Sequence, residues 1–271
     1  MGVLSHTLSW HWVFWFMGGF GMLLAVFWFA VMHAPDQHSK VTSEELDYLR
    51  ENGAIIDIEA NKKKRTPAPP GSIKVLLTSR IMAGVYLGQY CITSLQYFFI
   101  TWFPIYLVKG RGMDLLQVGF VATLPAICGF IGSILGGAIS DRVLKSGGSV
   151  TAARKILFVS GMLLASMLVF CNFTDSTAVI VALMSLALFG KGLAQIGLAV
   201  VVDTAPPEIV GVAGNIAGIV TPIAIGYILA ITNSFTGAMY MVGAHAMVGA
   251  PAYIFIVGKI KRLSLPKTVT A

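Results

Sequence analysis

Seven long apolar stretches constrain this chain more than any other feature of its sequence. Hydrophobic residues make up 56% of it and charged residues only 11%, and each stretch is apolar on all sides, so no polar face is left to meet water. A helix that crosses a bilayer needs about 20 apolar residues. We therefore expect an all-α, polytopic membrane helix bundle with about seven transmembrane helices. The expected spans are residues 12–32, 81–108, 115–139, 156–171, 177–202, 209–231 and 238–258.

The positions of the basic residues indicate how these spans are oriented. The formal net charge is +7, and apart from Lys109, Arg111 and Lys191 every Lys and Arg lies in one of three zones. Seven crossings place the zones on one side of the membrane, and cytoplasmic loops carry an excess of Lys and Arg. We therefore expect a plasma or inner membrane protein with its N-terminus outside and its C-terminus in the cytoplasm, and no nucleic-acid partner. The zones are Lys40–Arg80, Arg142–Lys155 and Lys259–Lys267.

One long polar segment separates the first span from the others. Thr42 followed by Glu45 is the pattern of a capping box, which predicts a short helix over 43–52. A basic run and a Pro-rich linker come next; the basic run fits a contact with anionic lipid, with a docking site for a nucleotide or a protein as the alternative. The predicted organisation is a single transmembrane helix in 1–33, a cytoplasmic linker in 34–74 and a six-helix bundle in 75–271.

The sequence has none of the arrangements that mark a soluble enzyme. It has no phosphate-binding glycine loop, no nucleophile elbow and no paired carboxylates. The three cysteines, Cys91, Cys128 and Cys171, lie in separate spans without the spacing of a metal site. We therefore predict that the protein is not an enzyme, that it carries no metal or cofactor, and that its thiols are buried.

Lys191 is the most informative polar residue, because it is the only formal charge in the middle of any span. A charge there costs at least about 2.5–3.5 kcal/mol unless it faces a wet cavity or a partner. The functional interpretation is an anchor for a substrate carboxylate, for which the flanking Gly190 and Gly192 leave room. The structural alternative is an ion pair with an acidic residue of another helix.

Polar side chains in the second span are further candidates for ligand binding. Gln89, Thr93, Gln96 and Tyr97 recur at helical spacing, so we expect them to share one stripe that lines an aqueous cavity and hydrogen-bonds hydroxyl groups. Asn215, in the sixth span, is a weaker candidate of the same kind. None of the 12 acidic residues lies in the middle of a span. Proton-coupled transport needs a titratable group at depth, so we expect any coupling carboxylate to lie outside this chain.

The loop after the third span resembles a signature of a known transporter family. Residues 136–145 read Gly-Gly-Ala-Ile-Ser-Asp-Arg-Val-Leu-Lys, which is similar to the Gly-x-x-x-Asp-Arg-x-Gly-Arg loop of the major facilitator superfamily, with Leu144 in place of the second glycine. In that family the Asp and Arg pair with neighbouring helix ends and help to hold one face closed. The resemblance therefore implies a gating role for Asp141 and Arg142; an exposed ion pair of little energetic weight is the alternative.

Other segments resemble the anion:cation symporter branch of that superfamily, and within it the bacterial permeases for glucarate, galactarate and hexuronate. The resemblance implies helices six to twelve of a twelve-helix sugar-acid:proton symporter, and so a partial major facilitator fold whose long polar loop joins two halves. The segments are the capped helix Thr42–Asn52, Tyr97-Phe98-x-x-x-Trp102-Phe103-Pro104-x-Tyr106-Leu107, Phe189-Gly190-Lys191-Gly192, Asp203-Thr204-Ala205-Pro206 and Gly214-Asn215-Ile216-Ala217-Gly218-Ile219-Val220-Thr221-Pro222.

The same resemblance implies a division of roles within the binding site. Lys191 would hold the carboxylate of an aldarate or uronate, while Gln89, Gln96, Tyr97 and Asn215 would bond its hydroxyls. The expected partners are the lipid bilayer, a small organic anion and a proton, with the coupling carboxylate supplied by a missing N-terminal half. Three alternatives are considered: a truncated fragment that transports nothing without a separate chain bearing that half, a membrane enzyme, and a purely structural membrane subunit. A membrane enzyme would require clustered polar catalytic residues at one interface, and the sequence shows none.

Overall fold

The structure, a computed structural model, places the described residues in two compact units, one within Met1–Pro69 and one within Pro70–Ala271. None of the described residues is in a β-strand. The predicted domain boundary at residue 74 and the basic run before it fall outside the described part of the chain. The described residues are 9–33, 37–38, 41–51, 78–204 and 212–260.

The prediction of an all-α bundle with seven spans is confirmed. Within the described ranges, seven helices are long and apolar enough to cross a membrane, and each corresponds to one predicted span. The helices of the second to fourth spans run further than the apolar pattern indicated, because their polar ends continue the same helix. The spans are His11–Val31, Arg80–Gly110, Leu115–Lys145, Val150–Phe173, Thr177–Val201, Asn215–Thr232 and Thr236–Val257.

The described residues of the first unit form one apolar and one polar helix. Helix α2 (Trp10–Val31) is hydrophobic all round, and none of its span is buried, as expected for a helix whose solvent is lipid. Helix α3 (Ser43–Glu51) begins where the capping pattern predicted: the Thr42 Oγ1 atom accepts a hydrogen bond of 3.3 Å from the Glu45 backbone N–H.

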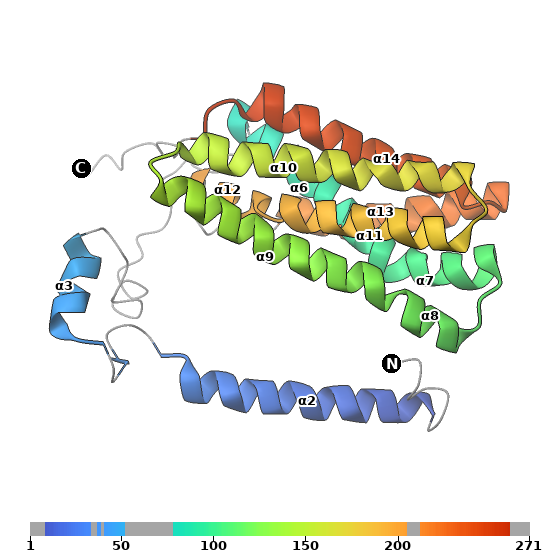
Figure 1. Cartoon of the computed structure of the whole chain (residues 1–271), viewed down its shortest axis with the longest axis horizontal. Coiled ribbons are helices and arrows are strands. Elements are labelled where there is room, and N and C mark those ends of the chain that lie inside the picture. The colour runs from blue at the N-terminus through green and yellow to red at the C-terminus, as the bar shows by residue number, and fades with distance from the viewer. Residues whose placement is uncertain (1–8, 34–36, 39–40, 52–77, 205–211, 261–271) are drawn as a thin grey trace, which may run out of the picture. The chain divides into compact units, whose positions relative to one another are not determined.

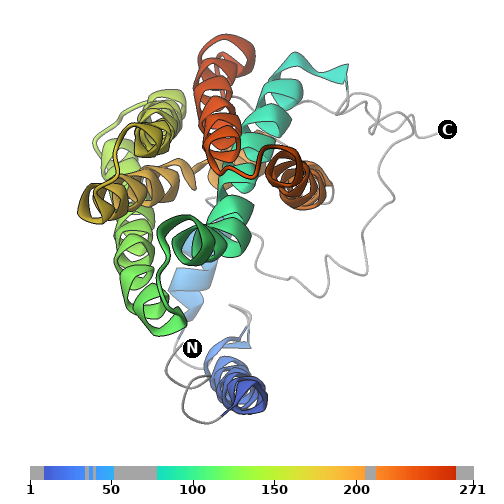
Figure 2. The same cartoon turned by 90° about the vertical axis from the view of Figure 1, so that its right-hand side faces the viewer.

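The second unit is a bundle of six membrane-spanning segments that run side by side (Figures 1 and 2). Short turns join most of the segments, so sequence neighbours are antiparallel. In chain order the elements are α6 (Arg80–Tyr97), η2 (Phe98–Trp102), α7 (Phe103–Ile105), η3 (Tyr106–Gly110), α8 (Leu115–Val121), α9 (Thr123–Lys145), α10 (Val150–Ser166), η4 (Met167–Phe173), α11 (Thr177–Ala194), α12 (Gly197–Thr204), α13 (Val212–Thr232), α14 (Thr236–Pro251) and η6 (Ala252–Val257).

Two of the prolines in the bundle accompany changes in helical geometry. Pro104 lies in α7, between the π-helical segments η2 and η3, and Pro251 ends α14 just before the π-helical η6. Proline has no N–H to donate to the carbonyl four residues earlier, and local widening of the helix lets the surrounding backbone groups find other partners. The long second span therefore continues through Pro104 to Gly110.

The core of the bundle forms around α6. The Phe158 ring of α10 stacks on the Tyr253 ring of η6 with a centroid distance of 3.6 Å, and Leu95 and Phe98 are fully buried in the same core. Many large apolar side chains on the outside of the bundle are exposed, among them Phe130, Phe170 and Ile223. Such an apolar surface matches a lipid environment rather than water.

Glycine faces let the helices of the bundle approach closely. A Cβ atom added to Gly136 would lie 3.1 Å from the Leu193 carbonyl oxygen of α11, and one added to Gly84 would lie 2.9 Å from the Val257 backbone nitrogen. Gly161 of α10 and Gly190 of α11 face each other in the same way. In lipid there is no hydrophobic driving force for helix association, so close van der Waals packing of this kind supplies much of the attraction between helices.

Polar contacts define the two ends of the bundle. At the first end, Arg80 donates to the Phe255 carbonyl oxygen at 2.9 Å and Lys155 donates to the Ile254 carbonyl oxygen at 2.9 Å. We call it the Arg154 end, after the residue that precedes Lys155. At the other, which we call the Arg111 end, Arg111 donates to the carbonyl oxygen of Thr174 at 3.0 Å. Each end thus joins helix termini that are distant in sequence.

Candidate functional site

A cavity of about 340 Å³ opens beside the middle of the second unit, between the helix that contains Gln96, the α8–α9 helices and α11. It contains Lys191, the lysine that the sequence placed in the middle of a span. The two helical segments bring Lys191 and Gln96 together although they are 95 residues apart in sequence. The cavity is thus built around a charged residue at membrane depth, where an unpaired charge is costly.

Lys191 donates a hydrogen bond from Nζ to the Oε1 atom of Gln96. Lysine can only donate, so this contact orients the amide with its oxygen toward the lysine and leaves its NH₂ group for another acceptor. No acidic side chain contacts Lys191 within the described ranges, so the structural alternative of an ion pair finds no support there. An ammonium ion has three donors, and the two that Gln96 does not use are suited to an anion.

The walls of the cavity are mostly apolar. Phe99, Phe103 and Phe130 contribute aromatic rings, and Ser133 is the one hydroxyl-bearing residue among those that line it. Ser133 donates to the carbonyl oxygen of Gly129 at 3.0 Å, which leaves its oxygen available as an acceptor. A concave, mostly apolar site with a few convergent polar groups is the usual form of a small-molecule site. Here those groups favour a small organic anion.

The other predicted ligand contacts do not line this cavity. Gln89 donates to the Thr93 Oγ1 atom at 3.4 Å, and its own Oε1 atom is buried without a partner among the described residues. The ring of Tyr97 lies against Gly218 of α13, and Asn215 is exposed near the start of that helix. The predicted stripe is therefore divided. Tyr97 follows Gln96 directly and points about 100° away from it, whereas Gln89 lies on nearly the same face of α6 as Gln96 but about two turns away along the helix.

The predicted gating pair is exposed at the end of α9. Neither Asp141 nor Arg142 forms an ion pair with another described residue. The ion pair at this end is instead between Arg154 of α10 and Asp203 of α12, with 3.3 Å between Nε and Oδ2. Arg154 also donates to the Ser140 hydroxyl of α9 at 2.8 Å. This cluster could not be predicted from the sequence, because an Arg and an Asp 49 residues apart give no signal that they are close in space.

The predicted burial of the thiols holds for two of the three cysteines. All three are free thiols; Cys91 and Cys171 are buried, whereas Cys128 is half-buried. Across the part of the chain that the structure describes, no three His, Cys, Asp or Glu side chains are close enough to hold a metal ion.

Comparisons with known proteins point to one family. The model of the Major Facilitator Superfamily matches residues 1–214 of the chain. The chain is 50% identical over 275 residues to a protein of Escherichia coli strain K12 named probable galactarate/D-glucarate transporter GudP, an alignment that covers 98% of this chain and 61% of the relative. The protein of the same name from Bacillus subtilis strain 168 is also 50% identical, with 98% of this chain and 60% of the relative covered.

A more distant relative carries a related name. The D-galactonate transporter of Escherichia coli O6:H1 is 37% identical, with 96% of this chain and 62% of the relative covered. The chain thus spans about three fifths of the length of the curated relatives it matches. All three names are those of transporters and none is that of an enzyme.

Proposed function

Because the chain belongs to the major facilitator superfamily, we propose that this multi-pass membrane protein forms the C-terminal part of a permease for a sugar acid. The proposed substrate is a six-carbon, hydroxylated dicarboxylate of the kind that the relatives' names state, galactarate or D-glucarate. In such permeases the substrate site lies near the middle of the bilayer, between two repeats that rock against each other. The predicted family and the predicted absence of enzyme activity agree with the comparisons.

The observation that carries this proposal is the contact between Lys191 and Gln96 in an otherwise apolar cavity. The ammonium group binds one carboxylate of the substrate, and a charge-assisted hydrogen bond in a dry site is stronger than one in water. The NH₂ group of Gln96 and the Ser133 oxygen then meet the hydroxyls. Gln89, Tyr97 and Asn215 stay predicted contacts, because they lie outside the cavity in the described conformation.

The proposal also covers the orientation of the chain in the membrane and the coupling of transport to protons. The basic residues of the Arg154 end place that end in the cytoplasm by the charge rule, with the Arg111 end outside. Proton symport needs a titratable group at depth, and the described spans hold no Asp or Glu near Lys191. The coupling carboxylate is therefore assigned to a part of the permease that this chain does not cover. Asp141 and Arg142 are proposed to act at the cytoplasmic face as it opens and closes.

A binding experiment on the whole chain tests the role of Lys191. The chain is purified into lipid nanodiscs, and D-glucarate binding is measured by isothermal titration calorimetry for the natural sequence and for Lys191→Gln. Loss of a charged hydrogen-bond partner costs about 1.5–3 kcal/mol, which corresponds to roughly 10- to 150-fold weaker binding. Glutamine keeps a polar group beside Gln96, so the change isolates the charge.

Lys259→Gln is the matched control, because Lys259 is an exposed lysine near the Arg154 end. It is expected to bind D-glucarate as the natural chain does. Equal binding by the natural chain and by Lys191→Gln would contradict the proposed role. Uptake of radiolabelled D-glucarate by cells that make the chain alone, compared with cells that make a relative of full length, separates a transporting chain from a part that only binds.

A further inference from the structure

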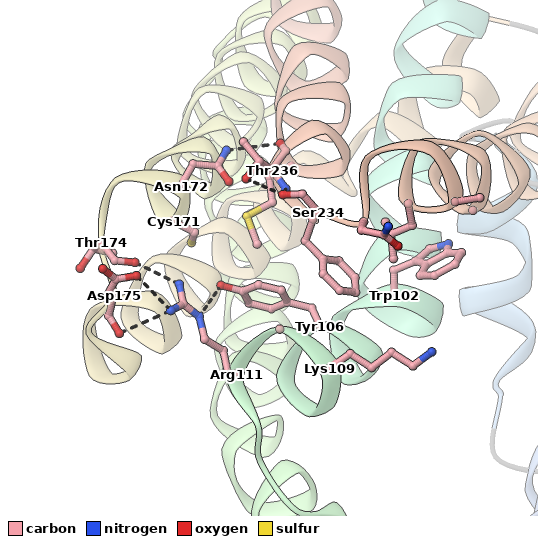
Figure 3. A pocket seen from close by; sticks show the side chains of 17 residues that line it. Trp102, Tyr106, Lys109, Arg111, Cys171, Asn172, Thr174, Asp175, Ser234 and Thr236 are labelled. Carbon is pink, nitrogen blue, oxygen red and sulfur yellow. Dashed lines mark hydrogen bonds and ion pairs between the residues drawn. The ribbon is translucent and has the colours of Figure 1, made fainter.

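A second and larger hollow lies at the Arg111 end of the bundle (Figure 3). Its volume is about 710 Å³, and it shares no lining residue with the cavity at Lys191. The end of the second span, the turn between η4 and α11, and the turn between α13 and α14 surround it. Three connections that are separate in sequence therefore enclose one space.

Arg111 holds one wall of this hollow in place. Its Nε atom donates to the Tyr106 hydroxyl at 2.9 Å, its Nη2 atom donates to the Thr174 carbonyl at 3.0 Å, and its Nη1 atom lies 3.5 Å from the Asp175 carboxylate. The guanidinium carbon also lies 5.6 Å from the centre of the Tyr106 ring. Arg111 is thus occupied by protein partners, and its charge offsets that of Asp175, the one acidic side chain of the lining.

Lys109 and Trp102 lie away from that network in the same hollow (Figure 3). The Lys109 side chain is exposed and has no hydrogen bond or ion pair with any other described residue. The indole Nε1 atom of Trp102 is buried, and no acceptor for its proton is present among the described residues. A buried donor without a partner costs about 1–3 kcal/mol, so this position favours an acceptor from outside the protein.

The remaining polar lining groups suit hydroxyls. Asn172 donates to the Thr236 carbonyl oxygen at 3.5 Å through its Nδ2 atom, which leaves its side-chain oxygen as an acceptor. Asn233 lines the hollow from the α13–α14 turn, where its positive φ of 48° is one that asparagine tolerates. With Arg111 and Asp175 paired, the charge left over in the hollow is the ammonium of Lys109.

We propose that this hollow is a second binding site for a hydroxylated carboxylate, separate from the one at Lys191. Lys109 binds the carboxylate, and the Trp102 indole N–H and the two asparagines contact hydroxyls. The ligand class rests on the proposed function, whereas the site itself rests on the lining of the hollow. At the end of the bundle proposed to face outward, such a site raises the local concentration of anions before they enter the membrane-depth site.

The test uses the full chain in nanodiscs of zwitterionic lipid, with the Lys191→Gln change present throughout. That background weakens the membrane-depth site by roughly 10- to 150-fold, so D-glucarate binding that keeps its strength in this background comes from elsewhere. Adding Lys109→Gln is expected to weaken this binding roughly fivefold, the order found for an exposed charge contact. Lys109→Arg is expected to restore it, and Lys259→Gln to leave it unchanged. D-Glucitol, which has the hydroxyls without a carboxylate, is expected to bind poorly.

A second variant tests the indole. Trp102→Phe keeps an aromatic ring but removes the N–H, and it is expected to weaken D-glucarate binding in the same background while the chain stays folded by circular dichroism. Binding that is the same with and without Lys109→Gln, or no binding in the Lys191→Gln background, overturns the second site. A different result would contradict the proposed function: D-glucarate binding that is the same in the natural chain and in the Lys191→Gln variant.

Discussion

The Nε atom of Arg154 lies 3.3 Å from the Oδ2 atom of Asp203, and this pair joins α10 to α12 at one end of the bundle. The Arg154 side chain is 13% exposed and that of Asp203 is 31% exposed. Arg154 also donates to Ser140, which adds α9 to the same cluster. Three helices therefore meet at one guanidinium group, which is suited to several acceptors at once.

We expect Arg154→Ala to lower the stability of the bundle by about 1–3 kcal/mol, because it leaves the partly buried Asp203 carboxylate without its partner. The measurement is thermal unfolding in detergent. Arg142→Ala is the control, since Arg142 is exposed and pairs with no described residue; its expected effect is within about 0.5 kcal/mol. Equal losses in the two variants would show that the cluster contributes nothing specific.

Gly161→Ala is expected to destabilise the chain, because a Cβ atom there would lie 2.7 Å from the backbone nitrogen of Ala194. Helices α10 and α11 would have to separate, at a cost of about 1–3 kcal/mol for overpacking. Gly137→Ala is the matched helical control, with no atom within 4 Å of the added Cβ. It is expected to be neutral or stabilising by up to about 1 kcal/mol. Unfolding midpoints that move in the same direction would contradict the packing argument.

Thr221→Val tests the buried hydroxyl contact between α13 and α6. Thr221 Oγ1 donates to Ser94 Oγ at 2.9 Å, and both residues are 0% exposed. Valine keeps the shape but removes the donor, so we expect a loss of about 1 kcal/mol. The double variant with Ser94→Ala should lose less than the sum of the single changes, because it leaves no unpaired hydroxyl. Additive losses in thermal unfolding would indicate that the two groups do not interact.

Gln96→Glu is expected to abolish D-glucarate binding at the Lys191 cavity while keeping the chain folded. The new carboxylate would pair with the lysine, satisfy its charge, and repel the anionic ligand. Gln96→Met, which removes the amide without adding a charge, should weaken binding by less than Gln96→Glu does. Calorimetry against D-glucarate measures both. Binding by Gln96→Glu at the strength of the natural chain would argue that the ligand carboxylate does not contact Lys191.

The sequence alone was enough to predict the spans, because continuous apolar stretches of this length have one stable solution in lipid. It was enough for the capped α3 helix as well, where Thr42 bonds to a backbone group three residues away. Each of these properties depends on residues that are near one another along the chain.

The tertiary structure decided which polar residues meet. Lys191 pairs with Gln96 rather than with an acidic residue, and Tyr97, the next residue, turns to α13 instead. The contact of Arg154 with Asp203 depends on the packing of α10 against α12. A helix points successive side chains about 100° apart, so their partners depend on the rotation and depth of neighbouring helices. Packing of the whole bundle sets those two quantities, and no local pattern of residues specifies them.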